Sequence, residues 1–318
     1  MKKVMELSHL TKTFGNGRGI FDVDFSVERG EVFGYLGQNG AGKTTTIRHL
    51  MGFLRPDEGA CSIFGRDCFA DAETIAEKLG YLSGEPVFFH DLTGEKYLEF
   101  MAGMRRMKSR KRMLELMDLF ELKEFGPVRK LSKGMRQKLG LICTFMDEPE
   151  AVILDEPTSG LDPLMQGRFV ELILEEKKKG TTVLMSSHMF EEIEKTCDRA
   201  AIIREGHIVD TFQMQELAKR RQKIYTVQFS DEEAAGRFVK RTGEPDGWQS
   251  AVMPAITVTA QKGSLVEMTV GGPPAALLGV LSGAGISDLT VRAQSLEELF
   301  LQYYQTRPEE PGHERRTT

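Results

Sequence analysis

A short apolar strand that runs into a glycine-rich loop constrains this chain more than any other stretch. Residues 32–36 (VFGYL) are apolar, and residues 37–44 (GQNGAGKT) fit the phosphate-loop pattern G-x-x-x-x-G-K-[ST]. Three glycines within six residues let successive backbone N–H groups point at an anion, and the helix that follows adds its positive N-terminal end. We therefore predict a strand, loop and helix unit in which Lys43 contacts phosphates and Thr44 ligates Mg²⁺.

The composition indicates more than one compact domain and no general affinity for polyanions. The 318 residues suffice for a core domain of about 200 residues and a smaller second one. The net charge of −5 does not imply a nucleic acid partner, so we expect none. The sequence has no apolar run near about 18 residues and no apolar segment behind its first lysines. We expect a protein that is neither secreted nor membrane-spanning.

The four cysteines give no sign of a disulfide or zinc framework. No two of them have the C-x-x-C spacing; they are Cys61, Cys68, Cys143 and Cys197. Isolated cysteines are typical of reduced thiols in a cytosolic protein.

Polar groups follow the apolar strands of the first two thirds of the chain. Residues 151–154 (AVIL) predict a buried strand that ends in Asp155 and Glu156, and a strand at 181–185 precedes His188. Two adjacent carboxylates at the end of a buried strand are costly unless a cation or a positioned water needs them. Because strands alternate with helices here, we predict a mainly parallel sheet with a ligand at its carboxyl edge.

Two further segments flank this predicted sheet. Residues 3–10 and 20–27 indicate an antiparallel pair of strands, and Phe14 between them is either a core side chain or a ring exposed near the nucleotide pocket. Residues 91–146 lack strand signals and are rich in Leu, Met, Lys and Glu, which predicts a helical subdomain. Ser132 caps the last helix of that segment, and a capped helix start is also an anion site.

The pattern changes from about residue 223, where we predict a second, small α/β domain. The predicted strands are 223–229, 265–270 and 287–292, and the predicted helices are 231–242, 274–283 and 295–304. This part contains no catalytic constellation, which leaves packing or dimer contact, or else regulation or partner docking, as its role. We place the domain boundaries at 1–215 and 222–305, with a disordered tail at 306–318.

Five motifs in this order resemble the ATP-binding subunit of ABC transporters. They are residues 37–44, 131–135, 151–156, 159–162 and 188, and the resemblance covers residues 1 to about 215. It implies an α/β P-loop NTPase of ABC type, with a mainly parallel sheet core, an N-terminal antiparallel β-subdomain and an inserted helical subdomain at about 86–146. The small α/β C-terminal domain lies outside the resemblance.

The resemblance also implies ATP and Mg²⁺ as ligands and a role for each motif. The phosphate loop would hold the nucleotide with Gly37, Asn39, Gly40, Ala41, Gly42, Lys43, Thr44 and Thr45. Phe14 would stack on adenine, and Asp155 would orient the metal held by Thr44. Glu156 resembles the general base that polarises the attacking water, and His188 resembles the switch residue at the γ-phosphate.

In this family two subunits enclose two ATP molecules, so each site needs residues from both chains. By resemblance, Ser132 and the Gly134 amide would bind the γ-phosphate held by the partner chain, while Asp162 would link the two sites. The motif reads Leu-Ser-Lys-Gly-Met instead of the common Leu-Ser-Gly-Gly-Gln, but the serine and second glycine are retained. The family's metal-ligating Gln is absent, since Gly84 occupies its position, and we hypothesise that Glu85 replaces it.

The leading functional hypothesis is an ATPase that dimerises, as a homodimer, and drives transport through a separate membrane-spanning polypeptide. The likeness to exporter subunits favours export, with the chain on the cytoplasmic face of the membrane as a peripheral protein. The alternative is a soluble ABC-type ATPase that remodels ribosomes or DNA, although such relatives usually carry two nucleotide domains or a coiled-coil insertion. A third reading, a module that holds ATP without turnover, is at odds with the intact Glu156 and His188.

Overall fold

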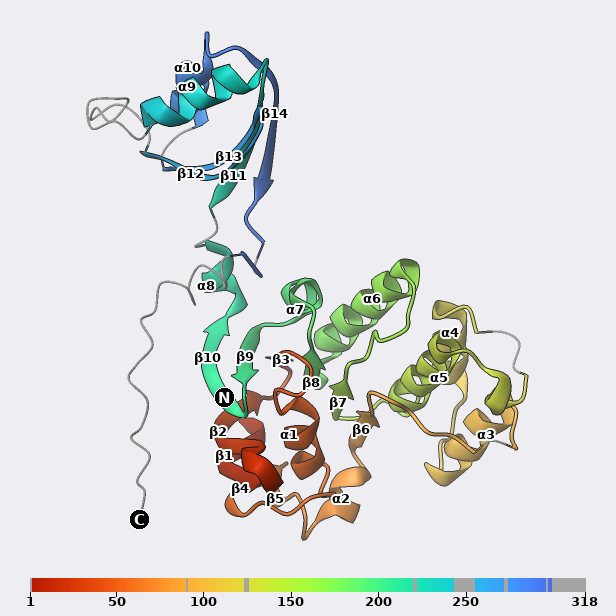
Figure 1. Cartoon of the computed structure of the whole chain (residues 1–318). Coiled ribbons are helices and arrows are strands. Elements are labelled where there is room, and N and C mark those ends of the chain that lie inside the picture. The colour runs from red at the N-terminus through yellow and green to blue at the C-terminus, as the bar shows by residue number, and fades with distance from the viewer. Residues whose placement is uncertain are drawn as a thin grey trace, which may run out of the picture. The chain divides into compact units, whose positions relative to one another are not determined.

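The structure is a computed structural model that divides into two compact units, Met1–Glu216 and Leu217–Thr318 (Figure 1). It describes residues 2–89, 91–122, 126–219, 222–242, 255–271, 274–295 and 297–298. No helix among these residues combines the length and the apolar character needed to cross a lipid bilayer. Each unit is described separately below.

A six-stranded sheet forms the centre of the first unit, in the order β10-β9-β3-β8-β7-β6. Its strands are β3 (Val32–Leu36), β6 (Leu79–Leu82), β7 (Ala151–Asp155), β8 (Thr182–Ser187), β9 (Arg199–Arg204) and β10 (His207–Gln213). All neighbouring strands pair in parallel except the β9–β10 hairpin. Every residue of β3, β7 and β8 is buried, as expected for parallel strands that are covered on both faces. The predicted mainly parallel sheet is confirmed.

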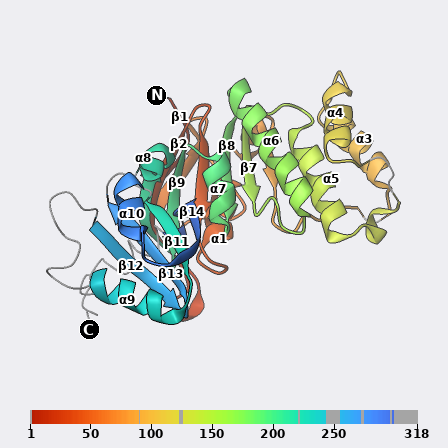
Figure 2. The same cartoon turned by 90° about the horizontal axis from the view of Figure 1, so that it is seen from above.

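Helices cover this sheet and a second, antiparallel sheet packs beside it. The helices are α1 (Lys43–Leu50), α2 (Ala72–Ala76), α6 (Pro163–Lys179) and α7 (Phe190–Thr196), while α8 (Met214–Lys219) spans the boundary between the two units. The second sheet has the order β2-β1-β4-β5, from β1 (Lys3–Thr13), β2 (Gly19–Glu28), β4 (Glu58–Ile63) and β5 (Arg66–Asp67). Ile47 and Leu50 of α1 lie in the apolar core between the two sheets, whereas α7 packs on β3 and β8 with α6 beside it (Figure 2). The phosphate-loop helix is thus anchored by both sheets.

The segment without strand signals folds into helices, as its composition predicts. They are α3 (Gly94–Met104), α4 (Lys111–Leu119), the single turn η2 (Val128–Lys130) and α5 (Lys133–Phe145) (Figure 1). The Ser132 hydroxyl accepts a hydrogen bond from the Met135 amide at 3.2 Å, which confirms the predicted cap of α5. Leu139, Leu141 and Ile142 are fully buried on that helix.

The second unit is a four-stranded antiparallel sheet with two helices. Its elements are β11 (Lys223–Phe229), α9 (Glu232–Thr242), β12 (Ala255–Lys262), β13 (Leu265–Gly271), α10 (Pro274–Leu281) and β14 (Ile286–Ala293), with strand order β12-β13-β11-β14. Phe229 and Phe238 meet at a ring-centroid distance of 5.1 Å in its apolar core. The sequence analysis missed β12. Most of the predicted helix at 295–304 and the whole tail at 306–318 lie outside the described residues.

Candidate active site

Strand order brings three polar loops to one edge of the central sheet. β3 lies between β9 and β8, and β8 in turn pairs with β7. Because these strands are parallel, the phosphate loop after β3, the Asp155–Glu156 pair at the end of β7 and His188 after β8 emerge side by side.

The phosphate loop has the backbone that its glycines were predicted to allow. Gly40 and Gly42 have φ angles of 83° and 117°, in the left-handed region, and a Cβ atom on Gly42 would come within 2.7 Å of the Ile20 side chain. Lys43 is buried, and its Nζ atom donates to the carbonyl oxygens of Gly37 at 2.6 Å and Gln38 at 3.3 Å. The lysine side chain thus joins the two ends of the loop. Asn39 and Ala41 lie within the loop, and Thr45 lies in the first turn of α1.

A hydroxyl and a carboxylate form the next contact across the sheet edge. The Thr44 Oγ1 atom donates to Asp155 Oδ2 at 2.8 Å, and Ser186 Oγ donates to Asp155 Oδ1 at 2.5 Å. Asp155 is 2% exposed, so both of its oxygens are fixed by hydroxyl donors within the fold. These oxygens are hard ligands of the kind that Mg²⁺ prefers, and Thr44 itself is exposed towards solvent. The residues present fit a magnesium site.

Glu156 connects the phosphate loop to the loop after β8. One carboxylate oxygen lies 3.0 Å from Lys43 Nζ, and the other lies 2.5 Å from His188 Nδ1. The backbone of Glu156 has a φ angle of 49°, which is uncommon for a residue with a side chain. The structure therefore brings together Lys43, Glu156 and His188, the three residues predicted to be catalytic, and their roles remain predictions.

The position of the missing glutamine lies beside the predicted metal site. A Cβ atom on Gly84 would lie 3.7 Å from Asp155 Oδ2, so a side chain there would reach the aspartate. Glu85 is exposed, and none of the contacts among the described residues joins it to Thr44 or Asp155. The metal role of Glu85 remains a prediction.

The remaining predicted residues lie elsewhere on the first unit. Phe14 precedes the turn η1 (Gly15–Gly17) and its side chain is 43% exposed, so it is not a core residue. Ser132 is exposed at the start of α5, while the Asp162 side chain caps α6 by accepting from the Met165 amide at 3.0 Å. No contact within the described part of the chain joins Phe14, Ser132 or Asp162 to the Lys43 and Glu156 cluster.

Sequence reasoning missed three buried polar side chains next to this cluster. Ser186 bonds both Asp155 and the Glu156 amide, the latter at 3.1 Å, and Gln137 donates to the Pro157 carbonyl at 2.8 Å. Glu192 accepts from Ser187 Oγ at 2.6 Å. Burial raises the pKa of the Glu192 carboxyl, with hydrogen bonds from Ser187 and Thr158 acting against that shift. Ser186 and Ser187 directly precede His188, which was an available signal; Gln137 and Glu192 sit on helices with no local sign of their contacts.

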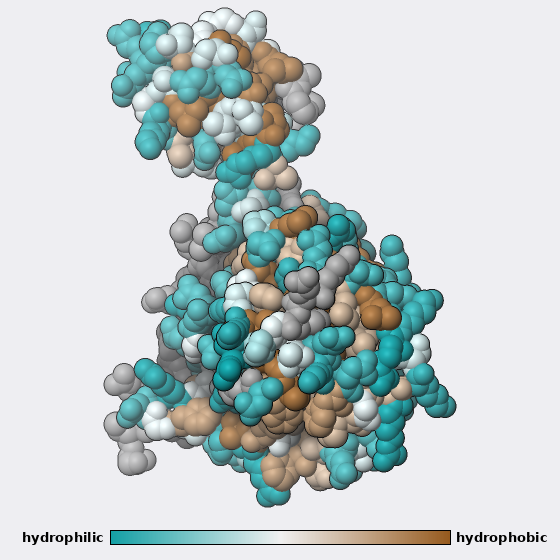
Figure 3. Space-filling model, turned by 90° about the vertical axis from the view of Figure 1, so that its right-hand side faces the viewer, coloured by the Kyte–Doolittle hydropathy of each residue, from teal (hydrophilic) through white to brown (hydrophobic). Residues whose placement is uncertain are grey.

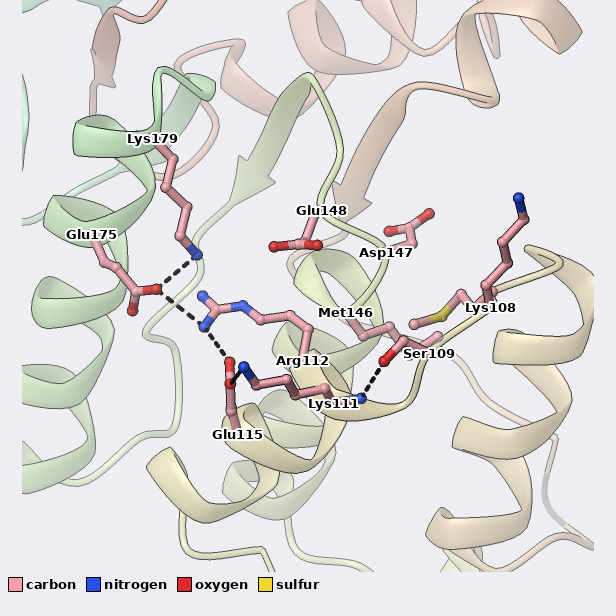
Figure 4. A pocket seen from close by; sticks show the side chains of 11 residues that line it. Lys108, Ser109, Lys111, Arg112, Glu115, Met146, Asp147, Glu148, Glu175 and Lys179 are labelled. Carbon is pink, nitrogen blue, oxygen red and sulfur yellow. Dashed lines mark hydrogen bonds and ion pairs between the residues drawn. The ribbon is translucent and has the colours of Figure 1, made fainter.

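A separate pocket of about 520 Å³ lies away from these residues, where the helical segment meets α6. Figure 4 shows that its side chains come from the start of α4, the loop after α5 and the end of α6. Arg112 points across it and lies 3.1 Å from Glu175 and 2.8 Å from Glu176, while Lys179 lies 2.7 Å from Glu175. The two Arg112 ion pairs connect α4 to α6, so the charged side chains that line the pocket hold these two helices together.

Comparisons with known proteins agree with this geometry. Residues 20–159 match the family model described as ABC transporter. The chain is 31% identical over 309 residues to the bacitracin transport ATP-binding protein BcrA of Bacillus licheniformis, covering 95% of this chain and 97% of that protein. It is 36% identical over 211 residues to the probable multidrug ABC transporter ATP-binding protein YbhF of Escherichia coli, covering 65% of this chain and 36% of that protein.

Solved structures show the same fold in the first two thirds of the chain. A structure described as the ATP-binding subunit of an ABC transporter has 32% identity and a TM-score of 0.62, covering 68% of this chain and 92% of that one. A dimeric ATP-binding cassette bound to ADP and Pi has 21% identity and a TM-score of 0.61, covering 66% and 98%. Given the similarity to BcrA over nearly the whole length of both proteins, the chain belongs to the ATP-binding proteins of ABC transporters.

Proposed function

We propose that two copies of this chain hydrolyse ATP at two shared sites and thereby drive export through a separate membrane-spanning protein. The observation that carries the proposal is the continuous contact from Lys43 through Glu156 to His188, beside the Thr44–Asp155 pair. This arrangement supplies a cation for phosphates, a carboxylate base and an imidazole in one place. Phosphoryl transfer needs chiefly such positioning and charge neutralisation.

The proposed reaction uses Lys43 and Glu156 in sequence. When ATP enters the loop, its phosphates replace the carbonyl and carboxylate partners of Lys43, which frees the Glu156 carboxylate to accept a proton from water. The water oxygen bonds to the γ-phosphorus as the bond to the β–γ bridging oxygen breaks, leaving ADP and phosphate. His188 holds the carboxylate in place and contacts the γ-phosphate.

Thr44 and Asp155 would hold Mg²⁺, with Glu85 as a further ligand in place of the missing glutamine. The bound ion supplies neutralisation of charge on the phosphates. Because a neutral Ser186 hydroxyl and the Thr44 hydroxyl both donate to Asp155, the carboxylate is kept oriented before the metal arrives. Phe14 has the exposure that stacking on adenine requires.

A second copy of the chain completes each site. Ser132 and Gly134 lie at the N-terminal end of α5, a 13-residue helix, and such an end favours an anion. They make no contact with Lys43 or Glu156 within the described chain, and by resemblance the phosphate they would bind is held by a partner chain. Asp162, which caps α6, would link the two sites, as the resemblance implies.

Exposed apolar side chains before and along α3 offer a docking surface for the membrane-spanning protein. Val87, Phe89 and Met104 are 84%, 58% and 68% exposed, and the Phe89 and Phe100 rings lie 5.6 Å apart. Figure 3, which faces the right-hand side of Figure 1, shows apolar side chains scattered among hydrophilic ones on that face. A helix of the partner bound there would hold this chain at the cytoplasmic face of the membrane.

The names of its relatives suggest a class of cargo. BcrA is named for bacitracin transport and YbhF for multidrug transport. We propose by analogy that the present chain energises the export of an antibiotic-like compound.

Co-purification from mildly solubilised membranes tests the proposal. The tagged Glu156→Gln protein, prepared with ATP, should remain as a dimer closed around its two ATP molecules. A polytopic membrane protein should co-purify with it in stoichiometric amount. Glu171→Gln, an exposed change on α6, is the matched control and should hydrolyse ATP at the wild-type rate. Recovery only with ribosomes, or alone in the soluble fraction, would contradict the transport role; wild-type turnover by Glu156→Gln would contradict its role as base.

The Glu85 assignment has its own test. In the assembled complex, Glu85→Ala should raise the Mg²⁺ concentration needed for half-maximal ATPase, whereas Glu77→Ala, at another exposed glutamate, should not. Unchanged Mg²⁺ dependence would remove Glu85 from the metal site.

A further inference from the structure

Gln137 links α5, the helix that begins with the Leu-Ser-Lys-Gly-Met motif and is called the signature helix below, to the backbone of the proposed catalytic base. Its side chain is 1% exposed, and its Nε2 atom donates to the carbonyl oxygens of Pro157 at 2.8 Å and Glu156 at 3.4 Å. A buried amide that gave up these acceptors would lose its hydrogen bonds at a considerable cost. The contact therefore fixes where the chain runs directly after β7.

The backbone at Glu156 needs this kind of support. With a φ angle of 49° the residue adopts a conformation that costs energy and that persists only where the surrounding structure imposes it. On one side, the Glu156 amide donates to the Ser186 carbonyl at 3.2 Å and to Ser186 Oγ at 3.1 Å. On the other side, its carbonyl accepts from the Ser159 amide at 3.1 Å and from Gln137. Gln137 is the part of this support that comes from the helical segment.

The same helix carries the proposed anion site for the partner's nucleotide. Ser132 caps α5, and Gln137 follows it by five residues, or about 7.5 Å along the axis. At the first turn, a Cβ atom on Gly134 would come within 2.7 Å of the Gly160 carbonyl oxygen, so the helix start lies directly against the loop after Glu156. Both ends of this short stretch of helix thus contact the loop that carries the base.

We propose that Gln137 is a positioning residue that couples the two ATP sites of the dimer, by tying the signature end of α5 to the Glu156 backbone of its own chain. The inference rests on the proposed function. A nucleotide held by the partner's phosphate loop fixes Ser132 and Gly134 of this chain. Through Gln137, that restraint aligns Glu156, which serves the nucleotide in this chain's own phosphate loop.

Mixed dimers test the coupling directly. One protomer carries Glu156→Gln, so a single site turns over, and Gln137→Met is placed either on the protomer with the intact Glu156 or on the silenced one. Methionine keeps the length of the side chain and removes the donor. On the protomer with intact Glu156 it should lower kcat roughly 10- to 100-fold with little change in KM, as expected for a displaced catalytic group. On the silenced protomer the loss should be smaller.

Both mixed dimers contain the same substitutions in total, so damage to folding lowers both rates alike. Thr144→Val is the matched control, since it removes the hydrogen bonds that the Thr144 hydroxyl donates to the Tyr81 carbonyl of β6 and to the Gly140 carbonyl of α5, towards the opposite end of the helix. It should show no dependence on placement. Equal loss in both placements, or no loss in either, would overturn the role of Gln137. The proposed function is tested separately, because the parent dimer with one Glu156→Gln must already lose turnover at one site.

Discussion

The two units of this protein differ in what they bury. The first unit buries Lys43, Gln137, Asp155 and Glu192 at 6% exposure or less, and each contacts another polar group. In the second unit, the buried side chains among the described residues are apolar apart from Thr269 and Gln294. Burying polar groups is costly, so a fold that does it at one sheet edge has a chemical use for that edge.

The second unit is built on another plan. Its core of Tyr225, Val227, Phe229 and Phe238 is held by apolar packing, in which removal of side-chain volume lowers stability and changes no chemistry. Any role for this unit in docking or regulation lies on its surface. The contrast predicts that substitutions will separate stability from activity according to the unit they fall in.

The largest expected effect is on the stability of the second unit. Phe238→Ala removes a ring that is 5% exposed and should lower the unfolding free energy of that unit by about 3–5 kcal/mol. The ATPase activity of the first unit should stay unchanged. Chemical unfolding followed beside ATPase assays measures both, with Arg237→Ala, an exposed change on α9, as control. A parallel loss of ATPase would show that the two units are not independent in this respect.

Next in size is an effect on activity with little effect on folding. Lys43→Ala removes the cation of the phosphate loop and should lower kcat/KM by about 10²–10³-fold. Lys177→Ala, a half-buried lysine at the end of α6, should leave the ATPase near wild type. Steady-state ATPase assays of both variants test this prediction. Retained activity in Lys43→Ala would show that ATP is not hydrolysed at this edge of the six-stranded sheet.

A feature of the site or the fold could be predicted when its sequence signal lies within a short stretch of the chain. The phosphate loop, the carboxylates after β7 and the cap of α5 were predictable because each is written in fewer than about ten consecutive residues. Gln137 was not, because its acceptors are carbonyl groups about twenty residues away that no side-chain pattern marks. Strand β12 had a usable signal, the alternation of Ile256 and Val258 with threonines, which the analysis overlooked.

Some of the predicted contacts involve a second copy of the chain or a ligand, so a single chain cannot display them. Ser132 takes its expected place at a helix start and Asp162 caps α6, yet the partner groups proposed for both belong to another copy. A parallel sheet, in contrast, is set by apolar strand patterns within one chain, and it was predicted correctly.

A smaller effect is expected where the start of α5 packs against the loop after β7. Gly134→Ala would place a methyl group 2.7 Å from the Gly160 carbonyl oxygen and should lower stability by about 1–3 kcal/mol, together with the ATPase rate. Gly167→Ala, within α6 and with no atom near its Cβ position, should instead raise stability by roughly 0.4–1 kcal/mol. Thermal unfolding of the pair measures the difference, and equal shifts would contradict the close packing at Gly134.

The smallest expected effect depends on pH. Burial raises the pKa of Glu192 above its ordinary 4.5, so the folded state binds this proton more tightly than the unfolded state. The unfolding free energy therefore falls as pH rises from about 4.5 through the folded pKa. Glu192→Gln should be more stable than wild type near pH 8 and lose that advantage as the pH falls towards 4.5. Denaturant unfolding across this range measures it, and a pH-independent difference would argue against a titrating Glu192.

The contact between Lys43 and Glu156 makes the two residues dependent on each other. Lys43 Nζ lies 3.0 Å from a carboxylate oxygen of Glu156, so the proposed phosphate-binding cation and the proposed base share one ion pair. In the proposed reaction the phosphates of ATP replace that carboxylate at Lys43, so binding of the nucleotide is coupled to release of the proposed base. A substitution of either residue would therefore change the surroundings of the other as well as remove its own role.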